Sequence, residues 1–525
     1  MQRNSLPLGV QDFEKLRNEG SVYVDKTEWI YKLVQPYLGL YFLSRPRRFG
    51  KTLLLSTLTC LFEGKRELFK GLWIDSHGDW DWKPHPVVSI DFNRMDHETP
   101  DALKKSIHKT LDNIIEENDL KITTDIIPMK FGDIIVALEK KADASVVVLM
   151  DEYDKPIHSH LGKGEEEVCI AAKNRDVLKQ LFGTLKAFDV APALRFVFLT
   201  GVSKFARVSV FSDLNNLSDL TMNPDYASLL GYTEEELYHY FDDYISELQT
   251  ARGFGKEKCK TDLRTWYNGY RFSDKELKVY NPFSILCVFA NKRFKNYWYE
   301  TGTPSFLLNL IKSQDYPIPE VEKLELDESS FSTYEIENLR IEALLFQTGY
   351  LTIAGHDEYF YTLDYPNQEV KSSFMKNLYY QFTEIKSLRT KDSFKLLAKY
   401  LKEEKSAEFI STVNTILASV TYHQLAHQNE PFYHTVFYLM LSASGVEVVT
   451  ELLTSQGRMD IAVFFEDKIY IIELKCNHDA ETAIRQIKEK KYADKYKTHG
   501  KRIILMGINF DTEKRELADW KMEEL

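Results

Sequence analysis

The chain contains 525 residues, of which 44% are hydrophobic and 28% are charged, and its formal net charge at pH 7 is −12. The length indicates several domains, and the acidic balance excludes a basic field over the whole molecule, so a nucleic-acid site would have to be a local patch. No apolar run approaches the roughly 18–20 residues that span a bilayer, and the N-terminus lacks the features of a signal peptide. We therefore expect a soluble cytoplasmic protein without a membrane partner. The five cysteines form no CxxC pair, so we expect no zinc site.

Strand-like and helical segments alternate over the first 225 residues. The strand-like runs are apolar, and they lie at 38–44, 85–92, 145–154 and 195–201. A helix is expected directly after Lys51, helical patterns extend to about residue 141, and a further helix is expected near 174–189. Strands that alternate with helices predict a doubly wound parallel sheet, in which ligands bind beyond the carboxyl ends of the strands.

The first strand leads into a degenerate phosphate-binding loop. The usual pattern is GxxxxGKT/S, and here Arg45 takes the first glycine position. Backbone N–H groups of such a loop and of the following helix N-terminus cradle phosphates, while Lys51 would reach the β- and γ-phosphates and the Thr52 hydroxyl would bind Mg²⁺. Loss of the glycine removes a permissive backbone position, whereas Arg45, Arg47 and Arg48 would add positive charge near the phosphates. The loop residues that we expect to bind nucleotide are Arg47, Arg48, Phe49, Gly50, Lys51 and Thr52.

Polar residues also end the third and fourth strands. Asp151 could hold the Mg²⁺ shell and Glu152 could polarise the attacking water, while Thr200 and Ser203 are placed to sense the γ-phosphate. A strand inserted between the loop strand and the Asp-Glu strand would be the arrangement of ATPases with a catalytic glutamate. Each feature alone is common by chance, since a carboxylate often marks where the burial of a strand stops. Their order on successive strand ends favours an ATP site.

Several of these stretches resemble the AAA-ATPase-like family of bacterial proteins. The matching stretches are residues 6–33, FLSRPRRFGKTLLLSTL, LMDEYDKPI, FVFLTGVSKF and residues 209–221. The resemblance covers about the first 300 residues, including WYNGYRF at 266–272 and VYNPFSIL at 279–286. It implies an AAA/ASCE-like P-loop NTPase with ATP and Mg²⁺ as cofactors. Since members typically carry the same RPRRFGK loop, the missing glycine is a family trait and not evidence of a dead site.

The middle of the chain is predicted to be mainly helical. A helix opens near residue 231 with a capping box formed by Thr233 and Glu236. The aromatic residues of 226–320 belong either to a lid behind the nucleotide site or simply to a helical core, and the WYNGYRF stretch is a candidate nucleotide contact. Residues 321–425 carry no recognisable chemistry and are expected to form a helical connecting region.

A second candidate site lies in GRMDIAVFFEDKIYIIELKCN at 457–477, which predicts a β-hairpin. With Glu466-Asp467 as a two-residue loop, Asp460 lies opposite Glu473, and Lys475 shares their face of the sheet. Two carboxylates can bind a hard cation such as Mg²⁺ or Mn²⁺, which stabilises a phosphorane-like transition state and acidifies water, while the lysine orients the nucleophile. Two alternatives remain. The register could slip, because Glu-Asp is not a favoured turn, and Glu473 with Lys475 could be an ordinary surface salt bridge.

The elements around the hairpin resemble the PD-(D/E)XK nuclease superfamily, which implies a metal-dependent nuclease. They are a helix, a strand, a second helix and a final strand, expected at 430–443, 446–453, 480–496 and 502–510. With the hairpin they form the αβββαβ core of a restriction-endonuclease-like domain over about the last 100 residues. In this resemblance Asp460, Glu473 and Lys475 correspond to the central triad, with the two carboxylates as metal ligands. The other correspondences are Glu430 on the first helix, with Glu451 as a competing candidate, and Gln486 and Tyr492 of a trailing QI…Y motif.

Residues 481–502 hold eight lysines and arginines against three acidic residues. Such a segment suits a nucleic-acid backbone, although a solvated helix face would have the same composition. No spacing typical of sequence-specific base reading is present. Nucleic acid is therefore an expected partner, with DNA favoured over RNA.

We expect an α/β protein of four domains. They are an AAA-ATPase-like P-loop domain, a helical lid region, a helical connecting region and a PD-(D/E)XK nuclease-like domain, at 1–225, 226–320, 321–425 and 426–525. The expected function is ATP binding and hydrolysis that control the access of nucleic acid to a metal-dependent nuclease. The alternative is a nucleotide-gated switch or scaffold whose nuclease-fold domain only binds nucleic acid or protein. Oligomerisation is left open.

Overall fold

The computed structural model describes residues 4–525 except for several short segments, and it falls into two compact units. The segments outside the described part are 205–213, 215, 301–304, 314–323, 333–339, 384–389, 421–429 and 454–457. One unit comprises Met1–Leu307 and Lys323–Asn367, and the other comprises Leu308–Glu322 and Gln368–Leu525. The boundaries of the four expected domains remain a prediction.

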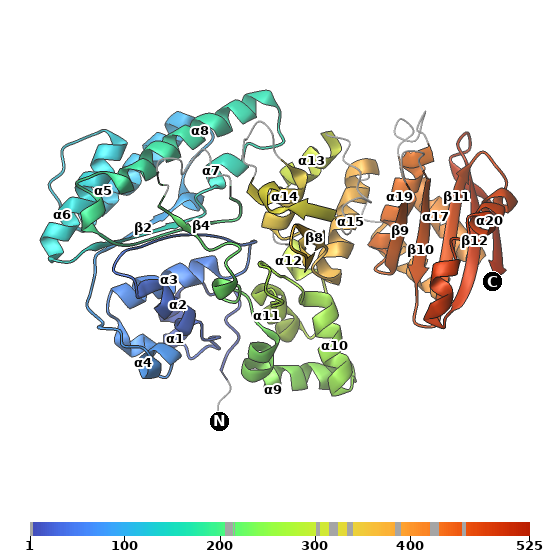
Figure 1. Ribbon diagram of the computed structural model, residues 1–525, viewed down its shortest axis with the longest axis horizontal. Helices are drawn as coiled ribbons and strands as arrows, with labels where there is room; N and C mark the ends of the chain where they lie inside the picture. The colour runs from blue at the N-terminus through green and yellow to red at the C-terminus, as the bar shows by residue number, and fades with distance from the viewer. Residues whose placement is uncertain are drawn as a thin grey trace. The chain divides into compact units, whose positions relative to one another are not determined.

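A five-stranded parallel sheet forms the centre of the first unit (Figure 1). Its order is β2-β3-β4-β1-β5. The strands are β1 (Gly39–Ser44), β2 (Val87–Asp91), β3 (Val146–Asp151), β4 (Leu194–Gly201) and β5 (Ser218–Asp219). β4 therefore lies between the loop strand β1 and the Asp-Glu strand β3, as expected for an ATPase with a catalytic glutamate. The α/β class and the four predicted strands are confirmed, while the edge strand β5 is too short to produce a periodic pattern.

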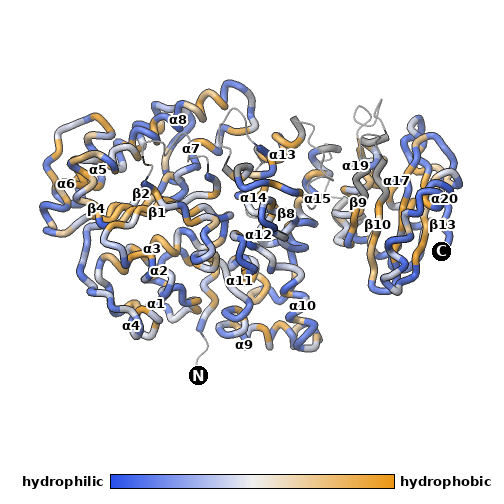
Figure 2. Tube along the Cα trace, in the orientation of Figure 1, coloured by the Kyte–Doolittle hydropathy of each residue, from blue (hydrophilic) through white to orange (hydrophobic). Residues whose placement is uncertain are grey.

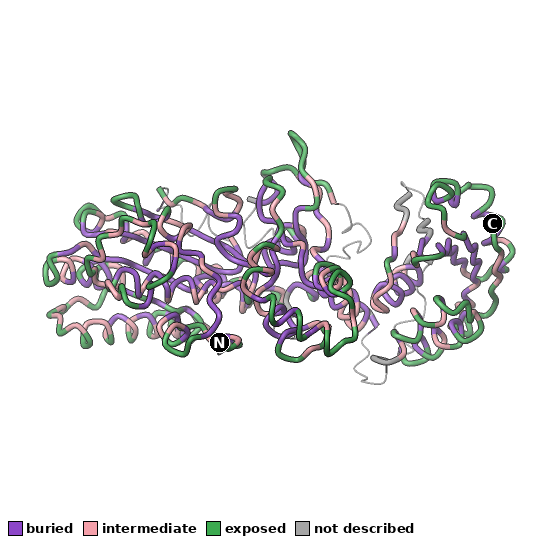
Figure 3. Tube along the Cα trace, turned by 90° about the horizontal axis from the view of Figure 1, so that it is seen from below, coloured by how far each residue is buried: buried purple, intermediate pink, exposed green. Residues whose placement is uncertain are grey.

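Helices cover both faces of this sheet (Figure 1). One face carries α1 (Phe13–Asn18), α2 (Thr27–Val34), α3 (Lys51–Phe62) and α4 (Trp73–His77), and the other carries α5 (Pro100–Glu117), α6 (Ile127–Ala142) and α8 (Glu165–Gly183). Because both faces are covered, every residue of β3 is buried. Figure 2 shows that the central strands are apolar, and Figure 3 shows the burial of each part of the chain. α8 begins well before the predicted residue 174, because its acidic start stabilises a helix N-terminus instead of interrupting it. The short helix α7 (Lys155–His158) follows β3.

A helical region follows the sheet in the chain. It contains α9 (Glu234–Arg252), α10 (Lys256–Tyr267), α11 (Pro282–Asn291), α12 (Tyr297–Glu300) and α13 (Ser305–Ser313). The predicted capping box is confirmed, since the Thr233 hydroxyl accepts from the Glu236 amide and the Glu236 carboxylate accepts from the Thr233 amide. Residues of α9, α10 and α11 share one hydrophobic core with Val22 and Val24. The helical region is thus packed against the N-terminal segment.

A small antiparallel sheet, in the order β6-β8-β7, lies in the middle of the chain. Its strands are β6 (Leu324–Asp327), β7 (Thr352–His356) and β8 (Phe360–Asp364), and α14 (Ile341–Thr348) precedes β7. The middle region is mainly helical as predicted, but residues 321–425 begin with this sheet and not with helices alone. The Asp357 carboxylate builds the hairpin turn by accepting from the amides of Tyr359 and Phe360. A turn of this kind depends on one polar side chain, so the helical periodicity of the region does not predict it.

The second unit contains a mixed sheet in the order β13-β12-β11-β10-β9, in which only the pair of β11 and β12 is parallel. Its elements are α19 (Glu430–Ala443), β9 (Glu447–Leu453), β10 (Arg458–Phe464), β11 (Lys468–Cys476), α20 (Ala480–Glu489), β12 (Arg502–Asp511) and β13 (Glu516–Glu524). This is the predicted αβββαβ order with one additional strand, β13. α20 ends before the predicted residue 496, because Lys491 has a φ of 56°, which interrupts an α-helix.

Among the described residues of this unit, the helices before α19 include α15 (Gln368–Thr383), α16 (Thr390–Lys402) and α17 (Ser406–Leu417). α20 covers one face of the sheet and shares a core with residues of β10, β11 and β12. No helix in the described part of the chain combines the length and the apolar character needed to cross a membrane.

Candidate functional site

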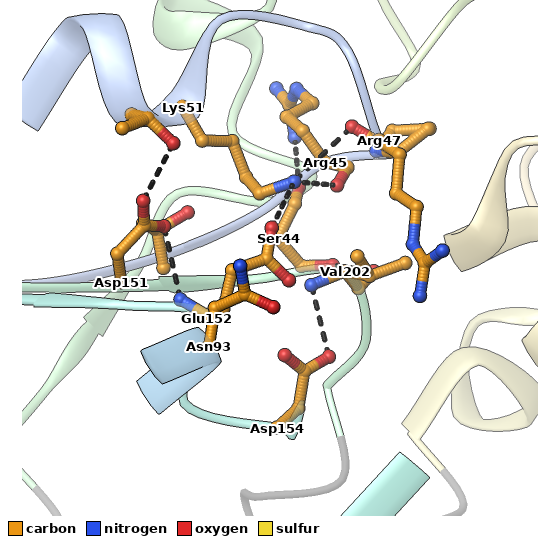
Figure 4. Close-up of polar contacts among 12 residues, drawn as sticks. Ser44, Arg45, Arg47, Lys51, Asn93, Asp151, Glu152, Asp154 and Val202 are labelled. Carbon is orange, nitrogen blue, oxygen red and sulfur yellow. Dashed lines mark hydrogen bonds and ion pairs between the residues drawn. The ribbon is translucent and has the colours of Figure 1, made fainter. Parts of the chain in front are cut away.

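Thr52 and Asp151 meet at the carboxyl edge of the parallel sheet, where Thr52 Oγ1 donates a 2.7 Å hydrogen bond to Asp151 Oδ2 (Figure 4). Gly50, directly before α3, has a φ of 96°, a left-handed conformation that glycine adopts without strain. Burial raises the pKa of Asp151 to about 6, although the Thr52 hydrogen bond and the Lys51 charge act to lower it. A hydroxyl and a carboxylate oxygen are ligands that Mg²⁺ prefers, so the pair fits a magnesium site.

Lys51 and Glu152 face each other at the same edge (Figure 4). The Lys51 ammonium lies 3.6 Å from Glu152 Oε1 and donates to the carbonyl oxygens of Arg45 at 3.1 Å and Pro46 at 3.3 Å. Glu152 has a φ of 50°, which is uncommon for a residue other than glycine. The structure thus brings together the loop lysine, the threonine and the Asp-Glu pair, which the sequence places more than ninety residues apart.

A pocket of about 440 Å³ opens beside these groups, and its lining includes Lys51, Thr52 and Glu152. Its other walls come from the N-terminal segment and from the helical region, and they include Pro7, Gly9, Val10, Gln11, Tyr232, Pro282, Phe283 and Leu286. Apolar and aromatic walls of this kind suit the base of a nucleotide. Sequence reasoning did not single out these residues, and the signal that could have found them was the VYNPFSIL stretch, which contains Pro282, Phe283 and Leu286.

Arg45, at the position of the missing glycine, is buried and does not serve the pocket. Its side chain is 1% exposed, and its guanidinium lies 4.2 Å from the ring centroid of Phe272. The same group donates to the carbonyl oxygens of Ser44 at 2.9 Å and Thr221 at 2.7 Å, and burial lowers its pKa. The expectation that Arg45 adds charge near the phosphates is therefore wrong. The side chain instead ties the loop to the segment after β5 and to the helical region.

Replacing Arg45 by alanine is expected to lower the free energy of unfolding by about 2–4 kcal/mol, because the change leaves a cavity and two carbonyl oxygens without a donor. Urea denaturation followed by tryptophan fluorescence measures the loss. The matched control is Arg48→Ala on the same loop, since the Arg48 side chain is exposed and its loss should cost less than about 1 kcal/mol. Equal stability of the Arg45 variant and the wild type would contradict the tying role.

The other loop residues differ in what they present to the pocket. Phe49 is buried, and its ring packs edge-to-face against Tyr270 at 4.9 Å and Phe272 at 5.5 Å. A phosphate could therefore meet only the backbone amide of Phe49. Arg47 and Arg48 both line the pocket and remain candidate nucleotide contacts. The WYNGYRF stretch, in contrast, supplies core residues such as the fully buried Tyr270 and does not belong to the pocket lining.

Thr200 and Ser203 do not present their hydroxyls to the pocket, since both residues are fully buried. Thr200 Oγ1 donates to a carbonyl oxygen of β1 at 2.8 Å. The Ser203 hydroxyl bonds to the Asp154 carboxylate and to the His158 ring. The expected role as γ-phosphate sensors has no support from these side chains, which instead hold β4 against β1 and against the turn after β3. Residues 205–213 lie outside the described residues, and they include the last residue of FVFLTGVSKF and the start of the family-like stretch at 209–221.

In the second unit, β10 and β11 form the predicted hairpin in the predicted register, with Ile461 opposite Ile472. Continuing this register by one residue brings the backbone of Asp460 opposite Glu473. Asp460 is also paired with Glu451 of β9. The backbone positions of Glu451, Asp460 and Glu473 therefore form an acidic row across the three neighbouring strands β9, β10 and β11. Of the two candidates for the upstream acidic position, Glu430 and Glu451, the backbone of Glu451 is thus paired with that of Asp460.

Glu473 and Lys475 form a buried pair. Lys475 Nζ lies 2.7 Å from Glu473 Oε1, with the side chains 4% and 1% exposed, so the alternative of a surface salt bridge is excluded. Apart from the Lys475 ammonium, no donor among the described residues forms a hydrogen bond with a Glu473 oxygen. A buried carboxylate is stable when it is paired or coordinates a metal. The oxygen atoms of Glu473 are ligands of the kind that a hard divalent cation takes, and the backbone of Asp460 lies opposite Glu473.

Other predicted residues of this site are placed less completely. Of Glu430, Glu451 and Asp460 the structure describes the backbone alone, and Glu430 is the first residue of α19. Gln486 is among the buried residues of α20, and Tyr492 belongs to the core that α20 covers. Within the described side chains no group of three His, Cys, Asp or Glu residues is placed to hold a metal ion. The side chains of Glu451 and Asp460 are not among the described ones.

The basic segment 481–502 is partly neutralised by carboxylates. The ion pairs are Arg502 with Glu404 and Glu524, Lys497 with Asp494, and Lys488 with Glu523. Lys490 and Lys491 are exposed. The positive field of the segment is therefore weaker than its composition suggests, and its binding to a nucleic-acid backbone stays a prediction.

Comparison with known proteins places the two sites in two known families. Residues 7–211 match the family described as Predicted AAA-ATPase, and residues 428–520 match the PD-(D/E)XK nuclease superfamily. Over 540 aligned residues the chain is 36% identical to a protein of Azotobacter chroococcum mcd 1, described as an uncharacterized protein in the vnfD 5′ region, and the alignment covers 100% of both chains. The similarity therefore extends through the regions between the two matched segments.

Proposed function

We propose that this chain, which belongs to the predicted AAA-ATPase family and carries a PD-(D/E)XK nuclease superfamily domain, hydrolyses ATP and uses the nucleotide state to control cleavage of nucleic acid. The observation that carries the ATP half is the meeting of Lys51, Thr52, Asp151 and Glu152 beside one pocket. For the nuclease half it is the buried Glu473–Lys475 pair opposite Asp460.

At the first site each residue has a separate task. Lys51 would exchange its carbonyl partners for the β- and γ-phosphates, and Thr52 and Asp151 would hold Mg²⁺, whose charge would offset that of the phosphates. Glu152 orients the water that attacks the γ-phosphorus and accepts its proton. The bond from the γ-phosphorus to the bridging oxygen then breaks, and ADP and phosphate leave.

At the second site Asp460 and Glu473 would hold Mg²⁺ or Mn²⁺, and the metal would supply acidification of a water molecule and a positive charge for the transition state. Lys475, beside Glu473, orients the water toward the phosphorus of the backbone. Glu430 and Gln486 are the expected supporting residues. The rival proposal, a switch whose nuclease-fold domain only binds nucleic acid or protein, gives the buried Glu473–Lys475 pair no task, and burial of two charges is costly. The pair therefore favours the enzyme.

The test of coupling uses Glu152→Gln in the full-length protein. This variant should bind ATP with Mg²⁺ but hydrolyse it about 10²–10⁴-fold more slowly, because binding needs the loop whereas turnover needs the activated water. With ATP present, its cleavage of single-stranded, duplex and branched DNA should differ from that of the wild type by about 5–150-fold, the usual range of allosteric coupling. Calorimetry measures ATP binding, phosphate release measures ATP hydrolysis, and gel assays measure DNA cleavage.

The same assays with no nucleotide and with a non-hydrolysable analogue serve as controls. Binding linkage is reciprocal, so the factor by which DNA changes the affinity for ATP should equal the factor by which ATP changes the affinity for DNA. Identical cleavage in all nucleotide states, together with an ATP affinity that DNA does not change, would leave two independent activities on one chain.

A further inference from the structure

The turn after β3 presents two side chains to the candidate ATP pocket. Between Asp151 and His158 every residue is buried except Glu152 and Lys155, and both of these line the pocket that contains Lys51. Glu152 has the role proposed above. Lys155 adds a second lysine side chain to the pocket that contains Lys51. The packing of the turn does not depend on the Lys155 side chain, because the buried contacts come from its neighbours.

Buried hydrogen bonds fix the turn that carries Lys155. Asp154 Oδ2 accepts from two backbone amides that follow β4, at 2.9 and 2.7 Å, and the Lys155 amide donates to the Glu152 carbonyl at 2.9 Å. Burial raises the pKa of Asp154, but the His158 charge and the hydrogen bonds outweigh this effect and hold the pKa at about 2. The carboxylate therefore stays ionised, and the backbone at Lys155 is preorganised relative to Glu152.

The loop carries four cations of its own, and three of them, Arg47, Arg48 and Lys51, also line the pocket. Arg45 is buried behind the loop, Lys51 extends from the start of α3, and the Arg48 guanidinium lies 4.8 Å from the ring centroid of Phe283, on the wall assigned to the base. Lys155 and Glu152 line the same pocket, and the hydrogen bond from the Lys155 amide to the Glu152 carbonyl keeps their backbones close. Lys155 therefore supplies a positive charge to the pocket in which Glu152 would activate the attacking water.

We propose that Lys155 contacts the γ-phosphoryl group and stabilises the negative charge that builds on it during hydrolysis. The inference rests on the proposed ATPase function. In that reaction the water oxygen bonds to the γ-phosphorus, the water proton passes to Glu152, and the bond to the bridging oxygen breaks to give ADP and inorganic phosphate. Lys155 keeps its proton throughout and acts by charge, the task that an arginine performs in other nucleotide triphosphatases.

The test compares Lys155→Ala, Lys155→Gln and Lys155→Arg with the wild type in the full-length protein, using calorimetry for ADP and phosphate release for turnover. The alanine and glutamine variants should lose about 10²-fold or more in kcat, the usual effect of removing one donor to developing charge. Their ADP affinity should stay within about twofold of the wild type, because ADP lacks the group that Lys155 contacts. The arginine variant should recover part of the loss. Lys163→Ala, an exposed lysine outside the pocket lining, is the control and should behave as the wild type.

The outcomes separate this inference from the proposed function. A wild-type protein that binds no ATP would overturn the ATPase assignment whatever the variants do. An active wild type whose Lys155→Ala and Lys155→Gln variants keep kcat within about threefold would overturn the role of Lys155 alone. An ADP affinity that falls as far as kcat would also overturn it, since the residue would then support the whole pocket and not the γ-phosphoryl group.

Discussion

Replacing Lys51 by alanine is expected to abolish detectable ATP binding. Lys51 is the loop cation beside Glu152, and the structure shows its ammonium already held among oxygen atoms by Arg45, Pro46 and Glu152. Truncating one partner of a buried charged contact costs about 2–5 kcal/mol, which is roughly a 30- to 5,000-fold increase in Kd. Isothermal titration of the full-length protein with ATP and Mg²⁺ measures this change directly.

A matched control is Lys70→Ala, because Lys70 is an exposed lysine of the same unit outside the pocket lining. It removes the same charge without touching the loop, so its ATP affinity should equal that of the wild type. Thermal unfolding of the Lys51 variant verifies that the fold is retained. An unchanged ATP affinity in a folded Lys51→Ala protein would remove the basis for a nucleotide site at this loop.

The second large effect is expected for Asp460→Asn, which should eliminate phosphodiester cleavage. The amide keeps the size of the side chain but loses the negative charge that a hard cation requires. Metal catalysis contributes several kcal/mol to the transition state, so the cleavage rate should fall about 10³-fold or more. ATP hydrolysis should stay near the wild-type rate, because the two candidate sites belong to different compact units. Cleavage gels and phosphate release on the same preparation measure both rates.

Asp467→Asn provides the comparison, since Asp467 is an exposed residue in the loop of the same hairpin. Titration with Mn²⁺ should show a binding event at the second site in the wild type and in this control, and none there in the Asp460 variant. Cleavage by Asp460→Asn at the wild-type rate, or Mn²⁺ binding that the substitution leaves intact, would be incompatible with a metal held by Asp460 and Glu473.

The central sheet and the hairpin could be predicted because burial leaves simple marks in the sequence. A strand covered on both faces, such as Val146–Asp151, is a continuous apolar run that ends where polar chemistry begins. The hairpin register followed from a two-residue loop and the alternation of faces. Both inferences depend on neighbouring residues, which a sequence shows directly.

The orientation of single side chains could not be predicted in the same way. The sequence led us to place Arg45 near the phosphates, because it does not reveal the true partners of this side chain. These partners, Phe272 and the Thr221 carbonyl, come from segments about two hundred residues away. Thr200 and Ser203 end the expected strand, yet their hydroxyls are consumed by β1 and by Asp154. The pocket walls join the N-terminal segment to α11, a meeting that no local pattern indicates.

The burial of Arg45 and Phe49 against aromatic residues of the helical region has an evolutionary consequence. Trp298 also donates to the Arg47 carbonyl at 3.0 Å, and a Cβ at Gly349 would lie 2.7 Å from the Pro46 ring. The segment of 7–211 is therefore not a cassette that recombination can move between proteins by itself. If recombination transferred only this segment, the side chains of Arg45 and Phe49 would lose the aromatic residues that cover them. We therefore expect the RPRRF loop and these aromatic residues to be inherited together.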